Sequence, residues 1–209
     1  MAPQFLNVDG KSLDAPDLAP LIDRNKITQL THETESLENL HNPHDLFFLL
    51  HDMRNGIPAE TSALDIIYHS HFIEHLSNYE CIPFLTECFR CLKKGGIMRF
   101  AVPDFELWCR KYIAKDPAFF DWYKNTYLGE AWDNHNTDAM VFSGMLFNWG
   151  HKMAYDFETL ALRLADVGFF DIKRMKWGES QIVPSLSTLE SSYSDRKIES
   201  LVIECQKPL

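Results

Sequence analysis

The fold is decided by residues 63–104, where Ala63–Leu76 reads ALDIIYHSHFIEHL and Phe84–Asp104 reads FLTECFRCLKKGGIMRFAVPD. The first stretch begins with a nearly continuous apolar run and the second ends with another, as expected of strands buried on both faces of a sheet. Between them, apolar residues recur at the helical period. Gly95 and Gly96 follow where a helix can stop. The order strand, helix, strand predicts a parallel pair joined by a helix.

The helix between these strands has clear end signals. Ser77 and Glu80 have the capping-box spacing, in which each side chain satisfies a free N–H at the other position. The apolar stripe that follows consists of Cys81, Leu85, Cys88, Phe89 and Leu92. A second helix is predicted to begin after Asp156, which can cap it, and to end at Gly168.

Strand-like and helix-like segments alternate along the rest of the chain, which predicts one α/β domain over residues 1–209 with a mostly parallel sheet and helices on both faces. The expected strands are Phe5–Val8, Lys26–Leu30, Leu46–His51, Ala63–His69, Ile97–Val102, Phe170–Lys176 and Ser200–Cys205. The pattern breaks between about 115 and 150. This aromatic-rich stretch is interpreted as a helical insertion over one end of the sheet, acting as its own core or as a lid on an acceptor pocket.

Composition narrows the functional classes. The net charge of −10 argues against binding to nucleic acid or to an anionic membrane surface. The apolar runs are too short to cross a bilayer, and the first residues lack the pattern of a secretory signal, so we expect no membrane insertion. The five cysteines are an odd number set mostly in apolar patterns, which favours reduced thiols and a cytoplasmic protein.

Polar side chains follow three of the predicted strands. Asp52 follows the third, Ser70 and His71 follow the fourth, and Asp104 follows the fifth. Because ligands of open parallel sheets bind beyond the carboxyl ends of the strands, these residues are expected to share a ligand-binding rim.

Four stretches carry a family resemblance: HDMRNGIP with ALDIIYHSHFIEHL, FLTECFRCLKKGGIMRFAVPD, HKMAYDFETLALRLADVGFFDIKR, and ESLVIECQKP near the end. In order and spacing they resemble class I S-adenosylmethionine-dependent methyltransferases, the group often called type 11. The resemblance covers most of the chain from about residue 45. It implies a Rossmann-like sheet, S-adenosylmethionine as cofactor, and methyl transfer to a small-molecule or sugar-like acceptor.

The resemblance also suggests site residues. The candidates for cofactor binding are Asp9, Gly10, Asp52, Met53, His69 and Ser70, and the candidates for catalysis are His71, Asp104 and His151. An aspartate after the third strand can accept a hydrogen bond from an adenine amino group, and one after the second can hold the ribose diol.

The N-terminus departs from the family pattern. Where the family has a glycine-rich loop, FLNVDGKS (Phe5–Ser12) contains a single glycine, Gly10. Either Phe5–Val8 is the central first strand with a degenerate loop, or NVDG is the acidic second strand and the first is missing. The N-terminal part is therefore altered or incomplete. This leaves as alternatives a catalytically inactive binding or assembly subunit, a chain completed by a partner protein, and a homo-oligomer.

Three other patterns each have more than one interpretation. His69, His71 and His75 invite a metal site, but no carboxylate or thiol clearly completes one, so we expect no metal. His71, Glu74 and His75 can supply a general base, but the sequence favours Glu74 and His75 as residues that cap the start of the next helix. Cys88 and Cys91 form a C-x-x-C inside the amphipathic helix, which favours helix packing.

Overall fold

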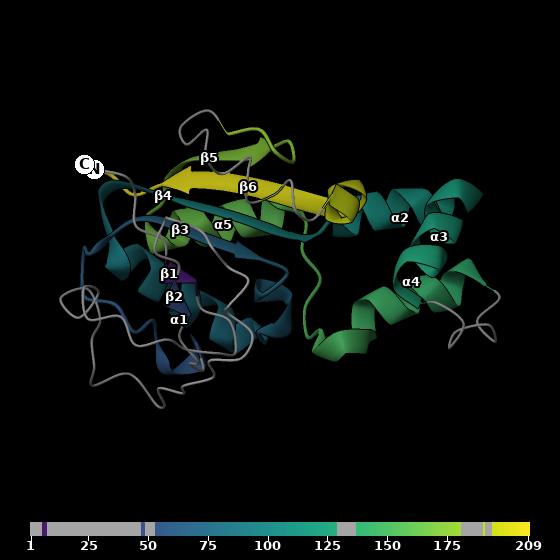
Figure 1. Ribbon diagram of the computed structural model, residues 1–209, viewed down its shortest axis with the longest axis horizontal. Helices are drawn as coiled ribbons and strands as arrows, with labels where there is room; N and C mark the ends of the chain where they lie inside the picture. Colours follow the sequence, from purple (N-terminus) through teal and green to yellow (C-terminus); the bar gives the residue numbers. More distant parts are fainter. Residues whose placement is uncertain (1–5, 8–46, 49–52, 129–136, 181–189, 191–193) are drawn as a thin grey trace.

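A computed structural model describes residues 6–7, 47–48, 53–128, 137–180, 190 and 194–209. Its main sheet has four strands in the order β3 (Leu64–Ser70), β4 (Leu92–Pro103), β6 (Ser200–Gln206) and β5 (Phe170–Met175) (Figure 1). β3 and β4 are parallel, as predicted, whereas β6 runs antiparallel to both β4 and β5.

A second, two-stranded sheet joins β1 (Leu6–Asn7) and β2 (Phe47–Phe48) in parallel. These pieces fall within the first and third predicted strands, while the predicted strand Lys26–Leu30 lies outside the described residues. The predicted fold class, an α/β Rossmann-like sheet with helices, is confirmed by the mixed sheet and its helices. No helix within the described ranges is long and apolar enough to cross a membrane.

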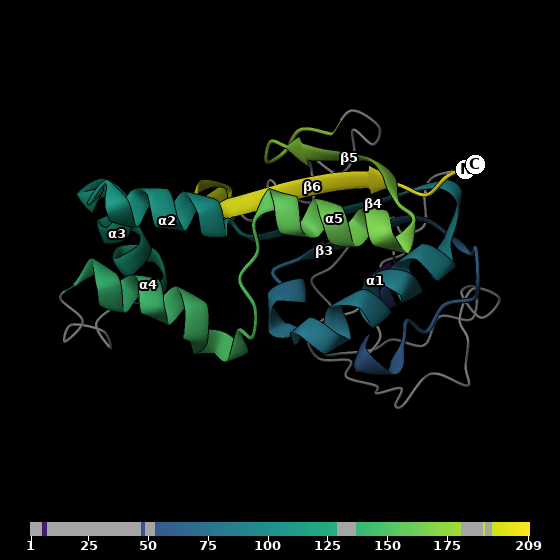
Figure 2. The same cartoon turned by 180° about the vertical axis from the view of Figure 1, so that it is seen from behind.

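Helices α1 (Asn78–Cys91) and α5 (Phe157–Val167) pack side by side against one face of the main sheet (Figure 2). Every second residue of the central strands faces them and forms the main apolar core. This core includes Leu85 and Cys88 from α1, Leu160 and Leu164 from α5, and Met98, Phe100, Val102, Leu201, Ile203 and Cys205 from β4 and β6.

Both predicted helix starts and the end of α5 at Gly168 are confirmed, whereas α1 ends before the predicted stop at Gly95 and Gly96, which lie within β4. The Glu80 carboxylate accepts a hydrogen bond of 2.7 Å from the backbone N–H of Ser77, and Asp156 accepts one of 2.9 Å from Thr159. Gly168 ends α5 with φ of +111°, a conformation that favours glycine. Gly96 is required for another reason, because a Cβ there would lie 2.9 Å from the carbonyl oxygen of Lys93.

The aromatic segment forms a second core beyond the end of the sheet (Figures 1 and 2). It comprises α2 (Phe105–Ile113), α3 (Pro117–Tyr123), a π-helical turn (Lys124–Leu128) and α4 (Asp138–Phe147). Trp108 is fully buried at its centre, with its ring centroid 4.7 Å from that of Tyr123 and 5.8 Å from that of Phe142. We call α2 to α4 with this turn the helical module. It begins at Phe105, earlier than the insertion expected from about residue 115.

The face of the sheet away from α1 and α5 carries a buried ionic network. Arg99 on β4 is directly opposite Glu204 on β6, and its Nη1 lies 3.3 Å from that carboxylate. The same guanidinium donates two hydrogen bonds to Glu190, at 2.8 and 2.7 Å. Ser180 donates to Glu204 at 2.8 Å, and Arg99 also donates to the Lys176 carbonyl at 3.1 Å. Each charge in this network is therefore paired and hydrogen-bonded.

Replacing Arg99 by alanine is expected to destabilise the protein strongly, because two buried carboxylates would lose their counter-charge. The expected loss in the free energy of unfolding is about 3–5 kcal/mol, measured by urea denaturation. Lys94→Ala, at an exposed position of the same strand, is the matched control and should change the value by less than about 0.5 kcal/mol. A loss below about 1 kcal/mol in Arg99→Ala would show that the network does not hold this face together.

Protonation of Glu80 should make part of the stability of the protein depend on pH. Hydrogen bonds from Ser77, with a further one from Lys152, lower the pKa of Glu80 from 4.5 to about 2. Its contribution is thus fully present above pH 4.5 and is lost as pH falls toward 2. The difference in unfolding free energy between the wild type and Glu80→Gln should be constant above about pH 5 and should shrink across that window. Lys152→Met, which keeps the Ser77 contacts, should retain most of this pH dependence; a pH-independent difference for Glu80→Gln would contradict the assignment.

Candidate functional site

The parallel strands β3 and β4 end at the same edge of the sheet. Ser70 is paired with Ala101, and the next backbone N–H, that of His71, donates to the Ala101 carbonyl at 2.8 Å. His71 then takes the left-handed conformation, with φ of +50°, which turns the chain out of the sheet into a short 3-10 helix, Ile73–His75. This turn delivers His71, Glu74 and His75 to the edge.

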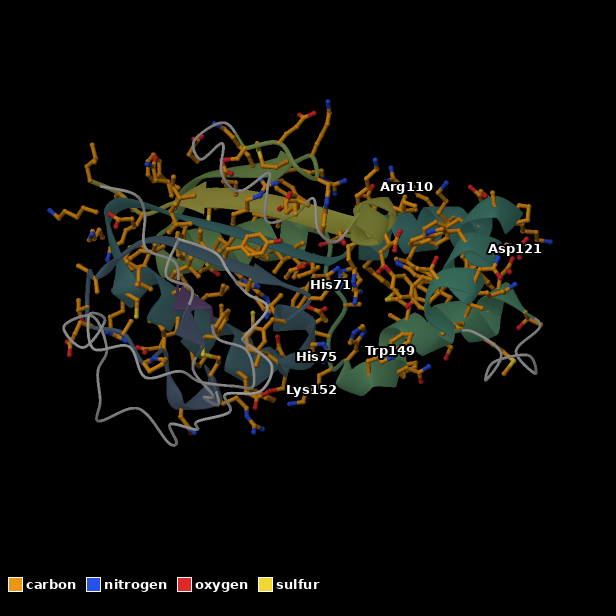
Figure 3. The ribbon with its side chains drawn as sticks, viewed as in Figure 1. His71, His75, Arg110, Asp121, Trp149 and Lys152 are labelled. Carbon is orange, nitrogen blue, oxygen red and sulfur yellow. The ribbon has the colours of Figure 1, made fainter. Side chains whose placement is uncertain are left out.

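A distant segment is tied to that turn through the backbone. The Glu74 carbonyl accepts hydrogen bonds from the N–H groups of Lys152 at 2.8 Å and Met153 at 3.1 Å. The contact brings His151 beside His75, with ring centroids 4.8 Å apart in an edge-to-face arrangement. Figure 3 shows His71 and His75 at the end of the sheet that faces the helical module, with Trp149 on the module side.

His71 is held at both ring nitrogens. Nε2 lies 2.8 Å from Ser200 Oγ, and Nδ1 lies 3.1 Å from a guanidinium nitrogen of Arg196. Because Arg196 can only donate, Nδ1 accepts and the Nε2–H donates to Ser200. Burial, reinforced by the charge of Arg196, lowers the pKa of His71 to about 4, so the ring is neutral at neutral pH.

Arg196 links His71 to two further groups. It donates to the buried carboxylate of Glu199 at 3.2 Å, and its guanidinium lies 5.0 Å from the centre of the Tyr127 ring. Burial raises the pKa of the Glu199 carboxyl. One arginine thus joins β3, β6 and the helical module at the edge of the sheet.

Glu74 is the exception in this polar cluster. It is 1% exposed, and within the described residues neither carboxylate oxygen has a hydrogen-bond partner. Its Oε1 lies 3.4 Å from His71 Nδ1 and 4.0 Å from His75 Nε2. Burial raises the pKa of this carboxyl. Buried polar groups are nearly always satisfied, so an unpartnered carboxylate indicates a functional position.

His151 is orientated by the helical module. Its Nδ1 lies 2.6 Å from the carbonyl oxygen of Met145 on α4, and a carbonyl can only accept, so Nδ1 carries the proton. The other ring nitrogen, Nε2, is left with a lone pair. Burial lowers the pKa of His151, which keeps the ring neutral at neutral pH.

The structure brings together two of the three predicted catalytic residues, His71 and His151, around Glu74. Asp104 lies on the same edge but caps α2, accepting from the Leu107 N–H at 3.0 Å, and pairs with Arg174 at 3.6 Å. Asp104 therefore caps a helix and pairs with Arg174 instead of joining the cluster around Glu74.

The structure describes only some of the predicted cofactor-binding residues. Asp9, Gly10 and Asp52 lie outside the described residues. Ser70 is the last residue of β3. Met53 packs against the main core. The His69 ring stacks on Phe100 with centroids 4.7 Å apart, and burial lowers the pKa of His69 to about 3, so it lies in an aromatic layer rather than beside the other histidines.

Sequence reasoning did not identify Arg196, Glu199 and Ser200 as site residues, and it assigned Glu74 and His75 to a helix start. For Glu74 and His75, a local signal was present in the sequence HFIEH (His71–His75). Arg196 is 125 residues from His71, and no local pattern connects them.

A family model described as a methyltransferase domain matches residues 10–100, which include β3, α1 and most of β4. The matched residues make up less than half of the chain. The match contains His71, Glu74 and His75, whereas His151 and Arg196 lie beyond it. No curated protein matches the sequence.

Solved structures similar to this chain share little sequence with it. A methyltransferase dependent on S-adenosylmethionine from Archaeoglobus fulgidus is 15% identical, with a TM-score of 0.43, and the match covers 84% of this chain and 73% of that one. Phosphoethanolamine N-methyltransferase 2 of Haemonchus contortus, in complex with phosphomonomethylethanolamine and S-adenosylhomocysteine, is 12% identical, with a TM-score of 0.41 and coverage of 78% and 38%. A chain from the complex of the Haloferax volcanii Trm112 methyltransferase activator with a methyltransferase is 14% identical, with a TM-score of 0.46 and coverage of 80% and 64%.

Replacing Arg196 by methionine should destabilise this edge, because Glu199 would keep a buried carboxylate without its ion-pair partner. The expected loss in the free energy of unfolding is about 1–3 kcal/mol, read from urea denaturation. Lys197→Met, at the exposed neighbouring position, serves as the control and should be close to neutral. Equal stability of the two variants would mean that Arg196 does not hold the edge together.

Proposed function

We propose that the chain is an S-adenosylmethionine-dependent methyltransferase that acts on a small-molecule or sugar-like acceptor at the edge formed by β3 and β4. The observation that carries the proposal is the convergence of His71, Glu74 and His151 beyond the carboxyl ends of these parallel strands, where open α/β sheets bind ligands. The match of residues 10–100 to a methyltransferase-domain model supports methyl transfer as the reaction class.

On the cofactor side, the proposal assigns Asp9 and Gly10 to the ribose and methionine ends and Asp52 to the adenine. It rests on the sequence for these residues. Ser70 supports it, since it ends β3 beside the turn that leads to His71. Met53 and His69 pack into the core, so their part is to shape the wall behind the cofactor.

On the acceptor side, methyl transfer is a direct displacement at a sulfonium, so alignment of the acceptor contributes most. His71 is a positioning residue in this proposal, because Arg196 and Ser200 engage both of its ring nitrogens. The imidazoles of His75 and His151 and the carboxylate of Glu74 are the groups that would meet an acceptor oxygen or nitrogen. The helical module lies beside them and would cover the acceptor.

The proposal includes a cytoplasmic location, which the cysteines support. All five are free thiols, and four of them are buried. A chain whose cysteines are all unpaired suits a reducing compartment.

The direct test is titration calorimetry of the full chain with S-adenosylmethionine, in which we expect binding in the micromolar range. Asp52→Asn should weaken binding about tenfold or more, because a hydrogen bond to a charged group would be lost. Asp65→Asn is the matched control: Asp65 is exposed at the opposite end of β3, paired with Lys93, and should not affect binding. Absence of heat at millimolar cofactor would instead identify the chain as an inactive binding or assembly subunit.

A further inference from the structure

We propose that Glu74, His75 and His151 form a binding site for one divalent transition-metal ion, with Zn²⁺ as the best-fitting member of that class. The three side chains come from the 3-10 helix after β3 and from the segment after α4. Their ligand atoms all lie within 4.8 Å of one another. Ligand atoms of a tetrahedral Zn²⁺ are about 3.4 Å apart, so side-chain rotations that move these atoms by about 1 Å would bring them to coordination distance.

The unpartnered carboxylate of Glu74 is an independent reason for a cation here. Its charge is buried at 1% exposure with neither oxygen hydrogen-bonded in the described part of the chain. The cationic side chains of this region are engaged elsewhere: Arg196 donates to Glu199 and His71, and Lys152 donates to Glu80 at 3.2 Å. An uncompensated buried charge is costly, and coordination of a metal removes that cost.

His151 has the arrangement of a metal-bound histidine. Metal-ligating histidines usually donate their second ring N–H to a carbonyl or carboxylate, which fixes the tautomer and directs the free lone pair at the ion. In His151, Nδ1 donates to the Met145 carbonyl at 2.6 Å. Its edge-to-face contact with His75, at 4.8 Å between centroids, brings both imidazoles beside Glu74.

The donor set defines the ion. Two imidazoles and one carboxylate suit Zn²⁺ and similar transition metals, whereas Mg²⁺ and Ca²⁺ prefer oxygen ligands. Three protein ligands leave at least one coordination position open, as in catalytic rather than structural zinc sites. His71, bound to Arg196 and Ser200, lies at the rim of the site and is not counted as a ligand. If the proposed function holds, the open position would receive the acceptor heteroatom; metal binding itself does not depend on that function.

The test uses the full chain after removal of metal by chelation. Titration with Co²⁺, a coloured substitute for Zn²⁺, should give visible absorption bands that saturate at one equivalent. Zn²⁺ at about 100-fold above its Kd should raise the melting temperature by roughly 5–10 °C. Glu74→Gln should weaken binding of both ions at least about 100-fold while leaving the metal-free protein folded. Glu158→Gln, an exposed carboxylate in the first turn of α5, is the matched control and should bind like the wild type.

Two results would overturn the proposal. One is a wild-type protein that is folded but binds neither ion, which would mean that Glu74 is buried as the neutral acid. The other is unchanged binding in Glu74→Gln, which would place the ion elsewhere. Should Glu74→Gln fail to fold, His75→Gln and His151→Gln give the same test, with near-ultraviolet circular dichroism to verify the fold. Calorimetry with S-adenosylmethionine on the metal-free protein separates failure of this site from failure of the proposed function.

Discussion

The parallel pairing of β3 with β4 is the constraint on which the site depends. The register that places Ser70 opposite Ala101 also lets the N–H of His71 bond to the same residue, so the strand ends with its last hydrogen bond satisfied. The chain must then turn at once, and His71 does so at φ of +50°, a conformation that is uncommon for residues other than glycine. A strained residue directly after a strand persists only where the surroundings hold it, and after β3 Ser200 and Arg196 do so.

Two groups of buried charge in this molecule have opposite character. The charges around Arg99 are paired, hydrogen-bonded from several directions and enclosed between strands and the 176–180 segment, which is what a structural network requires. Glu74 has the same degree of burial, yet its oxygens face only imidazoles. Since both groups carry a similar desolvation cost, the difference is in compensation. The network around Arg99 stabilises one face of the sheet. The buried charge of Glu74 lacks a counter-charge, which a bound ligand can supply.

Features of the chain that depend on near neighbours could be predicted from the sequence. The cap at Glu80, the left-handed stop at Gly168 and the strand after Gly96 each follow from residues within a few positions of one another. The site could be predicted only in part. His71 and His151 were identified separately. Their segments are held together by backbone hydrogen bonds to the Glu74 carbonyl, and His71 is held by Arg196; neither contact can be predicted from the periodicity of the sequence. The sequence also favoured no metal, because Glu74 and His75 are neighbours whereas His151, the third member of the cluster, comes from a distant segment.

The helical module takes part in building the site as well as enclosing it. Its aromatic core around Trp108 holds α4, and α4 presents the Met145 carbonyl that fixes the tautomer of His151. The π-helical turn of the module places Tyr127 beneath Arg196, which in turn holds His71. Both histidines therefore owe their orientation to the module rather than to the sheet alone. Changes in the aromatic core would move the two imidazoles relative to β3. In the proposed function, the packing of the module would therefore set the choice of acceptor, while the sheet would supply the fixed edge against which the acceptor is held.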